Sequence, residues 1–469
     1  NFIEKFSKIA PATPLLVVTV LQTIDGTGKS NLTQYSYMYE QLVQRSLIFV
    51  SHNDQALQNI FVGILSNMAY RMLLAKSRYI NADDLIKVVT DYKDEMLLQF
   101  NPIDIIQHLT NSAILVAVDE SSFKFKYPYL YYYFAGLYIS RHIAVPEIKE
   151  LLDHLSAHLY VEEYGNIMIF VCHFTNDEYV IDSVLTCALC ALDQYEEFDY
   201  SKPDRLLSSI NDSIEQQVPM LLVGNETDVD SQHKHQLETL DAEGVHDGSL
   251  TPISEGRIDD SPMEVADIVS AIRIIDVIGQ ILKNYPGEIN RDQKLDMITG
   301  ISDLAMRVVA LMYTAIGSTQ EDFIQLLTNV IREAEPDISQ SQILEAVKTM
   351  FASLVFGTSC SMIHSVCRAI GSRVLIPAIG AAKDKYKDNV ALKLIYAETG
   401  LITFDNSGYD ELIRLSKELK QGKLYYAYQT MRILVARHLR FNRCGVDYRN
   451  KLCDAYNLSK TSSVQVLPE

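Results

Sequence analysis

Residues 113–135 read AILVAVDESSFKFKYPYLYYYFA, and this stretch decides how the first part of the chain folds. An apolar, β-prone run ends at Val118, turn-forming residues follow, and residues 123–127 alternate apolar and polar side chains with period two. This pattern predicts a β-hairpin. Pro128 ends the second strand, and the tyrosine-rich residues after it predict a helix over 130–143.

Helical patterns precede this hairpin. Apolar residues recur three to five positions apart in 35–49, and either Asn53 or Asp54 can begin a helix that runs to about Leu74. Asn81 and Asn101 can cap two further helices. Several short helices, a hairpin and a return to helix are the order of a winged-helix module, in which the hairpin is the wing. We therefore expect such a module at 53–143, after a helical segment at 1–52.

The rest of the chain also has helical periodicity. Helices are expected at 147–160, 164–174, 179–198 and 204–217, and then at 265–283, 295–317, 323–334, 342–356 and 391–402. Between them, residues 219–262 predict a flexible acidic linker, because its central part has ten acidic residues, two basic ones and no aromatic ring. The expected fold class is mainly α, with a winged-helix module followed by two stacked-helix blocks at 144–218 and 263–469.

The composition limits the possible functions. The 469 residues include 41 Lys and Arg against 60 Asp and Glu, and the net charge of −19 disfavours nucleic-acid binding by general electrostatics. Neither a run of about 18 apolar residues nor a signal peptide is recognisable, and the seven scattered cysteines suggest no disulfide framework. We therefore expect a cytoplasmic protein that does not bind a membrane.

No catalytic or metal-binding residue is assigned from the sequence. Residues 26–30 resemble part of a phosphate-binding loop, but Thr23 stands where such a loop needs its first glycine, so we interpret them as a linker. Cys187 and Cys190 are interpreted as helical core residues, because zinc would need two more ligands. The tyrosines of 127–138 are interpreted as core residues with their hydroxyls at the rim, since few cations accompany them.

The segment 123–135 resembles the end of the winged helix in bacterial STAND-type NTPases, the NACHT-like signalling ATPases. Weaker similarities follow the same order as in that family. Residues 11–16, PATPLL, resemble the proline-bearing motif after the NTPase core, and further matches lie at 31–40, 165–173 and 278–286. Together they cover about residues 8–290. The resemblance implies the C-terminal part of such a protein, with the Walker A and B elements upstream of Asn1.

The resemblance also implies nucleotide contacts. Pro11 falls where the family packs a proline against adenine, and Tyr127 falls where the family has a histidine that senses the phosphates. Their alternative roles are a helix-start proline and a ring that packs the wing. The implied cofactor is ATP or ADP with Mg in a full-length ATPase, with none bound by this chain alone.

In function, the resemblance implies antiviral defence, in which recognition of a phage protein leads to ATP-dependent homo-oligomerisation and activation of an N-terminal effector. The candidate partner surface is a basic cluster that stands out in this acidic chain: Arg432, Arg437, Arg440 and Arg443, with Arg449 and Lys451 nearby. Its alternative is a solvated helix face. The alternative for the protein is a helical scaffold or a winged-helix regulator without nucleotide switching, although 102–111 lacks the Lys and Arg of a DNA-reading helix.

Overall fold

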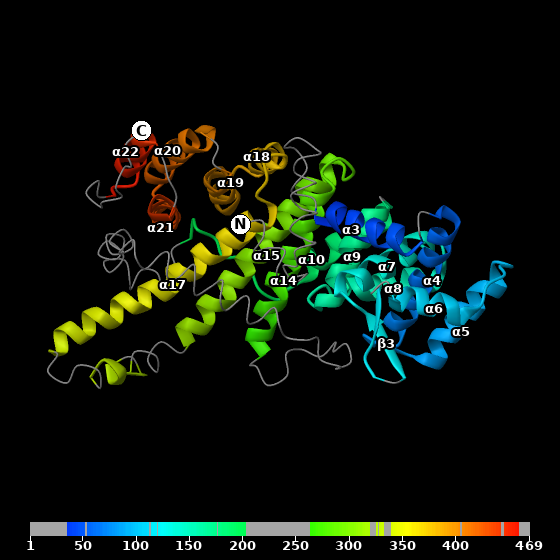
Figure 1. Ribbon diagram of the computed structural model, residues 1–469. Coiled ribbons are helices and arrows are strands. Elements are labelled where there is room, and N and C mark those ends of the chain that lie inside the picture. Colours follow the sequence, from blue (N-terminus) through cyan, green and yellow to red (C-terminus); the bar gives the residue numbers. More distant parts are fainter. Residues whose placement is uncertain are drawn as a thin grey trace. The chain divides into compact units, whose positions relative to one another are not determined.

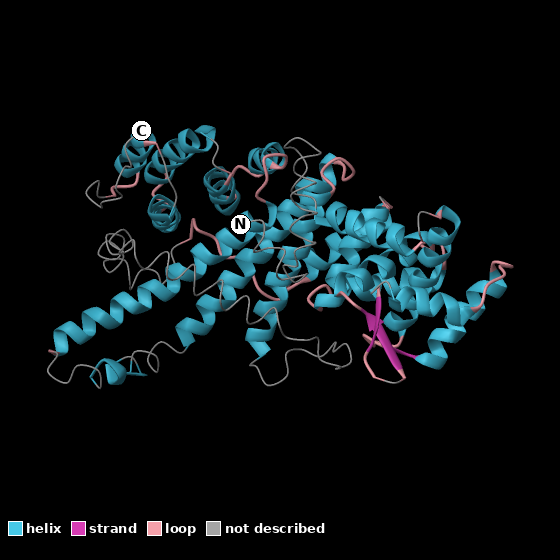
Figure 2. Ribbon diagram, in the orientation of Figure 1, coloured by secondary structure: helices cyan, strands magenta, loops and turns pink. Residues whose placement is uncertain are grey.

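The computed structural model describes residues 35–458 except 52–53, 112–113, 120, 176, 203–262, 319–324, 327, 333–338, 404–405 and 442–444. Pro11, the 26–30 loop, the helix expected at 204–217, the acidic linker and Arg443 lie outside the described residues. The described part is mainly helical, with a small antiparallel sheet of three strands (Figure 2).

Contacts divide the chain into two compact units. Within the described residues, the first unit comprises 35–187 and 283–289. The second comprises 188–202, 263–282 and 290–458.

The first unit opens with helices whose starts follow from local chemistry. α3 (Tyr35–Val50) is followed by α4 (Gln55–Leu74), which the Asp54 carboxylate caps by accepting hydrogen bonds from two backbone N–H groups of the first turn. Asn81 caps α5 (Ala82–Glu95) in the same way. The predicted helices and the predicted cap at Asn81 are confirmed, and of the two candidates for α4 the cap is Asp54.

The hairpin predicted within 113–127 is confirmed, and a third strand joins it. α6 (Pro102–Asn111) leads into β2 (Leu115–Ala117), which pairs antiparallel with β3 (Ser122–Phe125). β1 (Ile80–Asn81) pairs with the other edge of β3, so the strand order is β1-β3-β2. A strand of two residues is too short to show an alternating pattern, and β1 therefore escapes prediction.

α7 (Pro128–Arg141) is the central helix of the first unit. It packs against α4 and α9 (Glu162–Phe174), and α8 (Pro146–Ala157) packs against α9 (Figure 1). α10 (Glu178–Cys190) ends well before the expected residue 198. Leu192, two residues after its end, has φ 56°, a left-handed conformation that terminates helices.

The second unit is a stack of helices. α14 (Met263–Asn284) and α15 (Arg291–Ser318) confirm two predicted helices, whereas α17 (Gln340–Ile370) continues past the expected end at residue 356. Gly357 and the small polar residues after it remain helical, and Thr358 Oγ1 donates to the Leu354 carbonyl. After α17, the described helices are α18 (Ile376–Lys385), α19 (Val390–Ile402), α20 (Asn406–Gln421), α21 (Tyr425–Phe441) and α22 (Val446–Ala455).

α17 is the core helix of this stack. It packs against α15, α19 and α21. By length and composition, Thr349–Ile370 is the one segment of the described chain that is apolar enough to cross a membrane, with a mean hydropathy of 1.4. Most of its apolar window is buried against the rest of the protein, and this packing accounts for its composition.

α19 and α20 approach each other most closely at two glycines. A Cβ atom on either Gly400 or Gly408 would lie 2.7 Å from the Cα atom of the other. Since no real Cβ contact is that short, the crossing depends on both residues having no side chain.

Candidate functional site

Tyr127 lies at the junction between β3 and α7. Its extended backbone precedes Pro128, which takes the first position of α7. The half-buried Tyr127 ring stacks on Tyr129 with 5.5 Å between centroids, and the Nζ atom of the exposed Lys126 lies 5.4 Å from the Tyr127 centroid. A phenol and an ammonium group therefore adjoin at the base of the hairpin, and both can donate hydrogen bonds to an anion.

The tyrosines of α7 pack in the core, as predicted, but their hydroxyls do not all reach the rim. Tyr131 and Tyr132 are 4% and 5% exposed. The Tyr132 hydroxyl hydrogen-bonds to Asn166, whereas the Tyr131 hydroxyl is buried with no hydrogen-bond partner among the residues that the structure describes. Burial raises the pKa of both phenols, and that of Tyr133 to about 12. These rings are neutral packing residues.

An ion pair attaches the residues before β1 to α9. Glu163 is buried near the start of α9 and pairs with the partly exposed Arg78. A buried carboxylate requires such a partner, because its desolvation is otherwise costly. Burial raises the pKa of Tyr131, and the positive charge of Arg78 lowers it to a smaller extent. The turn that leads into the sheet is thus fixed against the central helices.

Residues 78–135 match the family model described as Novel STAND NTPase 4. The resemblance to STAND-type NTPases is thereby shown. The matching residues, here called the STAND segment, run from Arg78 through the sheet and into α7, and they include Tyr127. Searches of curated proteins and of solved structures give no match.

The basic cluster of the second unit does not form one surface. Arg432, on α21, is 8% exposed and donates to Gln429 Oε1 at 3.3 Å and to the Asn457 carbonyl at 3.2 Å. Arg437 is exposed, and Arg440 is half-buried one turn later on the same side of α21. Arg449 and Lys451 lie on α22, with Lys451 Nζ 5.3 Å from the Tyr448 ring centroid.

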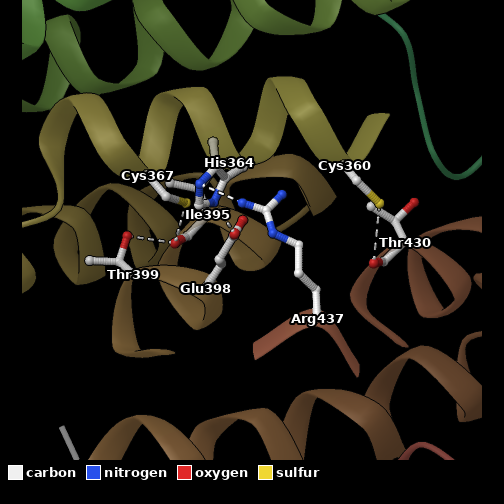
Figure 3. Close-up of polar contacts among 8 residues, drawn as sticks. All are labelled: Cys360, His364, Cys367, Ile395, Glu398, Thr399, Thr430 and Arg437. Atoms are coloured by element: carbon white, nitrogen blue, oxygen red, sulfur yellow. Dashed lines mark hydrogen bonds and ion pairs between the residues drawn. The ribbon is translucent and has the colours of Figure 1, made fainter. Parts of the chain in front are cut away.

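Arg437 belongs to a polar network that joins three helices (Figure 3). Its Nη2 atom lies 2.9 Å from His364 Nε2 on α17, and His364 Nδ1 lies 2.7 Å from Glu398 Oε1 on α19. Arginine can only donate, so His364 accepts at Nε2 and donates from Nδ1 to the carboxylate. This geometry assigns the neutral Nδ1–H tautomer to His364.

Glu398 is the buried end of this network. It is 4% exposed, and its Oε2 atom has no hydrogen-bond partner within the described part of the chain. The nearby thiol of Cys360 donates to the Thr430 carbonyl, and burial raises its pKa, so it is not an activated nucleophile (Figure 3). The network therefore orients and holds helices rather than supplying a reactive group.

This network was not predicted from the sequence, although one signal for it exists. Glu398 is the only charged residue in the stretch 394–402, LIYAETGLI, and a carboxylate in such an apolar setting needs a partner. The partner cannot be read from spacing, because His364 lies 34 residues away on another helix.

No three His, Cys, Asp or Glu side chains gather to hold a metal ion in the described ranges. The interpretation of Cys187 and Cys190 as core residues is wrong for Cys190. It is exposed because it is the last residue of α10, whereas Cys187 is half-buried.

Proposed function

We propose that this chain is the regulatory and sensor portion of a STAND NTPase in antiviral defence. The observation that carries the proposal is the match of the STAND segment to a STAND family. In this family the corresponding module lies behind the nucleotide switch, and a C-terminal region recognises the trigger. Stacked helices with broad outer faces, such as those of the second unit, are suited to such recognition.

The topology around the STAND segment supports a winged-helix module. α4, β1, α5, α6, β2 and β3 follow one another, and β3 lies between β1 and β2 in the sheet. A short first strand that pairs with the last one, after two intervening helices, is the arrangement of a winged helix, with the β2–β3 hairpin as its wing. The module proposed at 53–143 contains all of these elements.

The module is proposed to hold the full-length protein inactive by contacting the NTPase core, and to release that contact in the ATP-bound state. Tyr127 and Lys126 fit this role, since both offer hydrogen-bond donors that suit phosphate oxygens. Met96, Leu97 and Ile103 are exposed apolar residues of the module that can form the contact with the core. In the proposal, Pro11 packs against the adenine of bound ATP or ADP, with Mg.

A winged-helix DNA reader is the less favoured alternative. The helix that would enter the major groove is α6, which has neither Lys nor Arg, and its exposed residues include Ile103, Asp104 and Gln107. A DNA-reading helix needs cations that contact phosphates and base edges.

The first test of the proposal is to determine the sequence of the complete gene. A strand followed by G-x-x-x-x-G-K-[ST] before residue 1 is the expected finding, and its absence would end the proposal. The second test measures the mass of the full-length protein in solution with ATP, with and without candidate phage proteins. We expect homo-oligomers only when ATP and one phage protein are both present. Assembly that does not depend on nucleotide would favour a scaffold.

Arg437 and Arg440 are the residues of the basic cluster that we propose for the trigger or a neighbouring subunit. Arg437→Glu with Arg440→Glu should slow trigger-dependent assembly more at low salt than at high salt, because electrostatic steering is screened. Arg414→Glu with Lys417→Glu on the exposed face of α20 gives the same change in charge as a control. Because Arg437→Glu also removes the hydrogen bond to His364, assembly is measured at a temperature at which both variants are folded, and unchanged assembly would leave the cluster as a solvated face.

A further inference from the structure

A cleft of about 590 Å³ lies where the end of α20 and the first turns of α21 meet the residues after α22. It is independent of the STAND segment and of the proposals above. Six residues form most of its lining: Lys420, Lys423, Tyr425, Tyr428, Gln429 and Arg432.

The lining is strongly basic in an acidic protein. Lys420, Lys423 and Arg432 contribute three positive charges, and the lining includes no Asp or Glu. None of the three cations forms an ion pair with a residue that the structure describes. Lys420 Nζ instead donates to the Ala455 carbonyl at 2.8 Å and lies 4.8 Å from the Tyr428 ring centroid. The cleft therefore concentrates positive charge that no described residue neutralises by an ion pair.

Arg432 is the strongest indication that an anion belongs here. Arg432 is 8% exposed, and its guanidinium donates two hydrogen bonds to neutral oxygens, those of Gln429 and Asn457. Its Nε atom is buried without a partner among the described residues. Burying a charged group without an opposite charge is costly, so a partly buried anion beside Arg432 would offset this cost.

The size and the aromatic lining of the cleft define the ligand more closely. A single carboxylate would be satisfied by one arginine, whereas three cations suit the charge and multiple oxygens of a phosphate group. The volume lies within the range of small-molecule sites and exceeds the needs of a bare anion. Tyr425 and Tyr428 supply ring surfaces, and Tyr428 is fixed by a stack on Tyr456 with centroids 5.6 Å apart.

We propose that this cleft binds a small organic phosphate of nucleotide size. Its phosphate oxygens lie between Lys420, Lys423 and Arg432, and its organic part lies against Tyr425. The cleft would then give the helical C-terminal region a small-molecule ligand of its own.

Calorimetric titration of the 469-residue chain with ADP and with inorganic pyrophosphate tests the proposal. We expect both probes to bind, ADP more tightly because only ADP has a ring, and both more weakly at high salt. Lys423→Gln should weaken binding of each about tenfold, since it removes one contact between a cation and a phosphate. Arg432→Gln should weaken it further. Lys417→Gln, an exposed position of α20 outside the cleft, should leave both affinities unchanged.

If Arg432→Gln does not fold, the Lys423→Gln variant still tests the proposal. Lys423 is exposed in a turn, so its replacement should not disturb folding. Absence of binding at millimolar ADP and pyrophosphate would overturn the proposal, as would binding that Lys423→Gln does not weaken. Equal affinity for the two probes would overturn the assignment of the organic part to Tyr425. Binding of an Asp- and Glu-rich peptide that depends on Lys423, without binding of ADP, would make the cleft a peptide site and would also overturn the proposal.

Discussion

His364 and Glu398 join α17 to α19 through a hydrogen bond of 2.7 Å between Nδ1 and Oε1. The Glu398 side chain is 5% exposed and that of His364 is 30% exposed, so the bond links a buried carboxylate to a ring at the edge of the core. Arg437 donates to the other ring nitrogen and thereby sets which nitrogen of His364 carries the proton.

Glu398→Gln should lower the free energy of unfolding by about 1–3 kcal/mol, because a buried hydrogen bond loses its charged acceptor. Glu418→Gln is the matched control, since Glu418 is exposed and bonds to Lys393 at 2.5 Å. The control should cost less than about 1 kcal/mol, as exposed ion pairs do. Urea denaturation measures both changes, and equal losses would contradict a special role for Glu398.

Removing the hydroxyl group should affect the stability of the protein differently at two adjacent tyrosines of α7. Tyr131→Phe removes a buried hydroxyl that has no hydrogen-bond partner in the described structure, so stability should stay the same or rise. Tyr132→Phe breaks the hydrogen bond to Asn166 and should cost about 0.5–1.5 kcal/mol. Thermal unfolding of both variants makes the comparison. A larger loss for Tyr131→Phe would show that its hydroxyl has a partner.

His438 should make the protein less stable in mild acid. Burial lowers its pKa from 6.5 to about 4, so the folded protein keeps the ring neutral while the unfolded chain binds a proton below about pH 6.5. The contribution of His438 to stability is therefore present above that pH and is lost as the pH falls towards 4. His438→Gln should reduce the fall in melting temperature between pH 7 and pH 5, whereas His108→Gln on the exposed face of α6 should not.

Two helical glycines of the second unit should differ when replaced by alanine. At Gly279 on α14, a Cβ atom would lie 2.6 Å from the Ala369 carbonyl oxygen, so Gly279→Ala forces the backbone apart and destabilises the protein. At Gly357 on α17, a Cβ atom meets nothing within 4 Å. Gly357→Ala should therefore stabilise the protein by up to about 1 kcal/mol through helix propensity. Urea denaturation measures the change in the free energy of unfolding for each variant. A change of the same sign in both variants would contradict the close approach at Gly279.

Local signals predicted the first unit well. The caps Asp54 and Asn81 and the alternation of 123–127 depend on neighbouring residues, and the structure confirms them. Features that depend on distant contacts could not be predicted in this way. α17 continues through Gly357 because its far end packs against helices that are distant in the sequence, and these contacts cannot be read from the residues around Gly357.

The candidate sites show the same difference between features set by neighbouring residues and features set by distant contacts. Tyr127 could be named as a candidate because it lies in a contiguous motif, and the residues matched by the family model include it. The arginines at 432–443 were grouped because they are close in sequence, yet helix geometry turns Arg432 inward, where it lines the cleft, while Arg437 is exposed. His364 and Glu398 meet only because α17 and α19 pack together.

The crossing of α19 and α20 at Gly400 and Gly408 limits how these helices can move. Moving α20 along its own axis by one turn, about 5.4 Å, would bring Leu412 to the place of Gly408. The backbone contact leaves no room for a leucine side chain there, so α20 cannot shift by one turn in this direction. At the crossing itself neither Gly400 nor Gly408 has a side chain that would oppose a change of angle. We therefore expect any rearrangement of these two helices to change their angle and to keep their register.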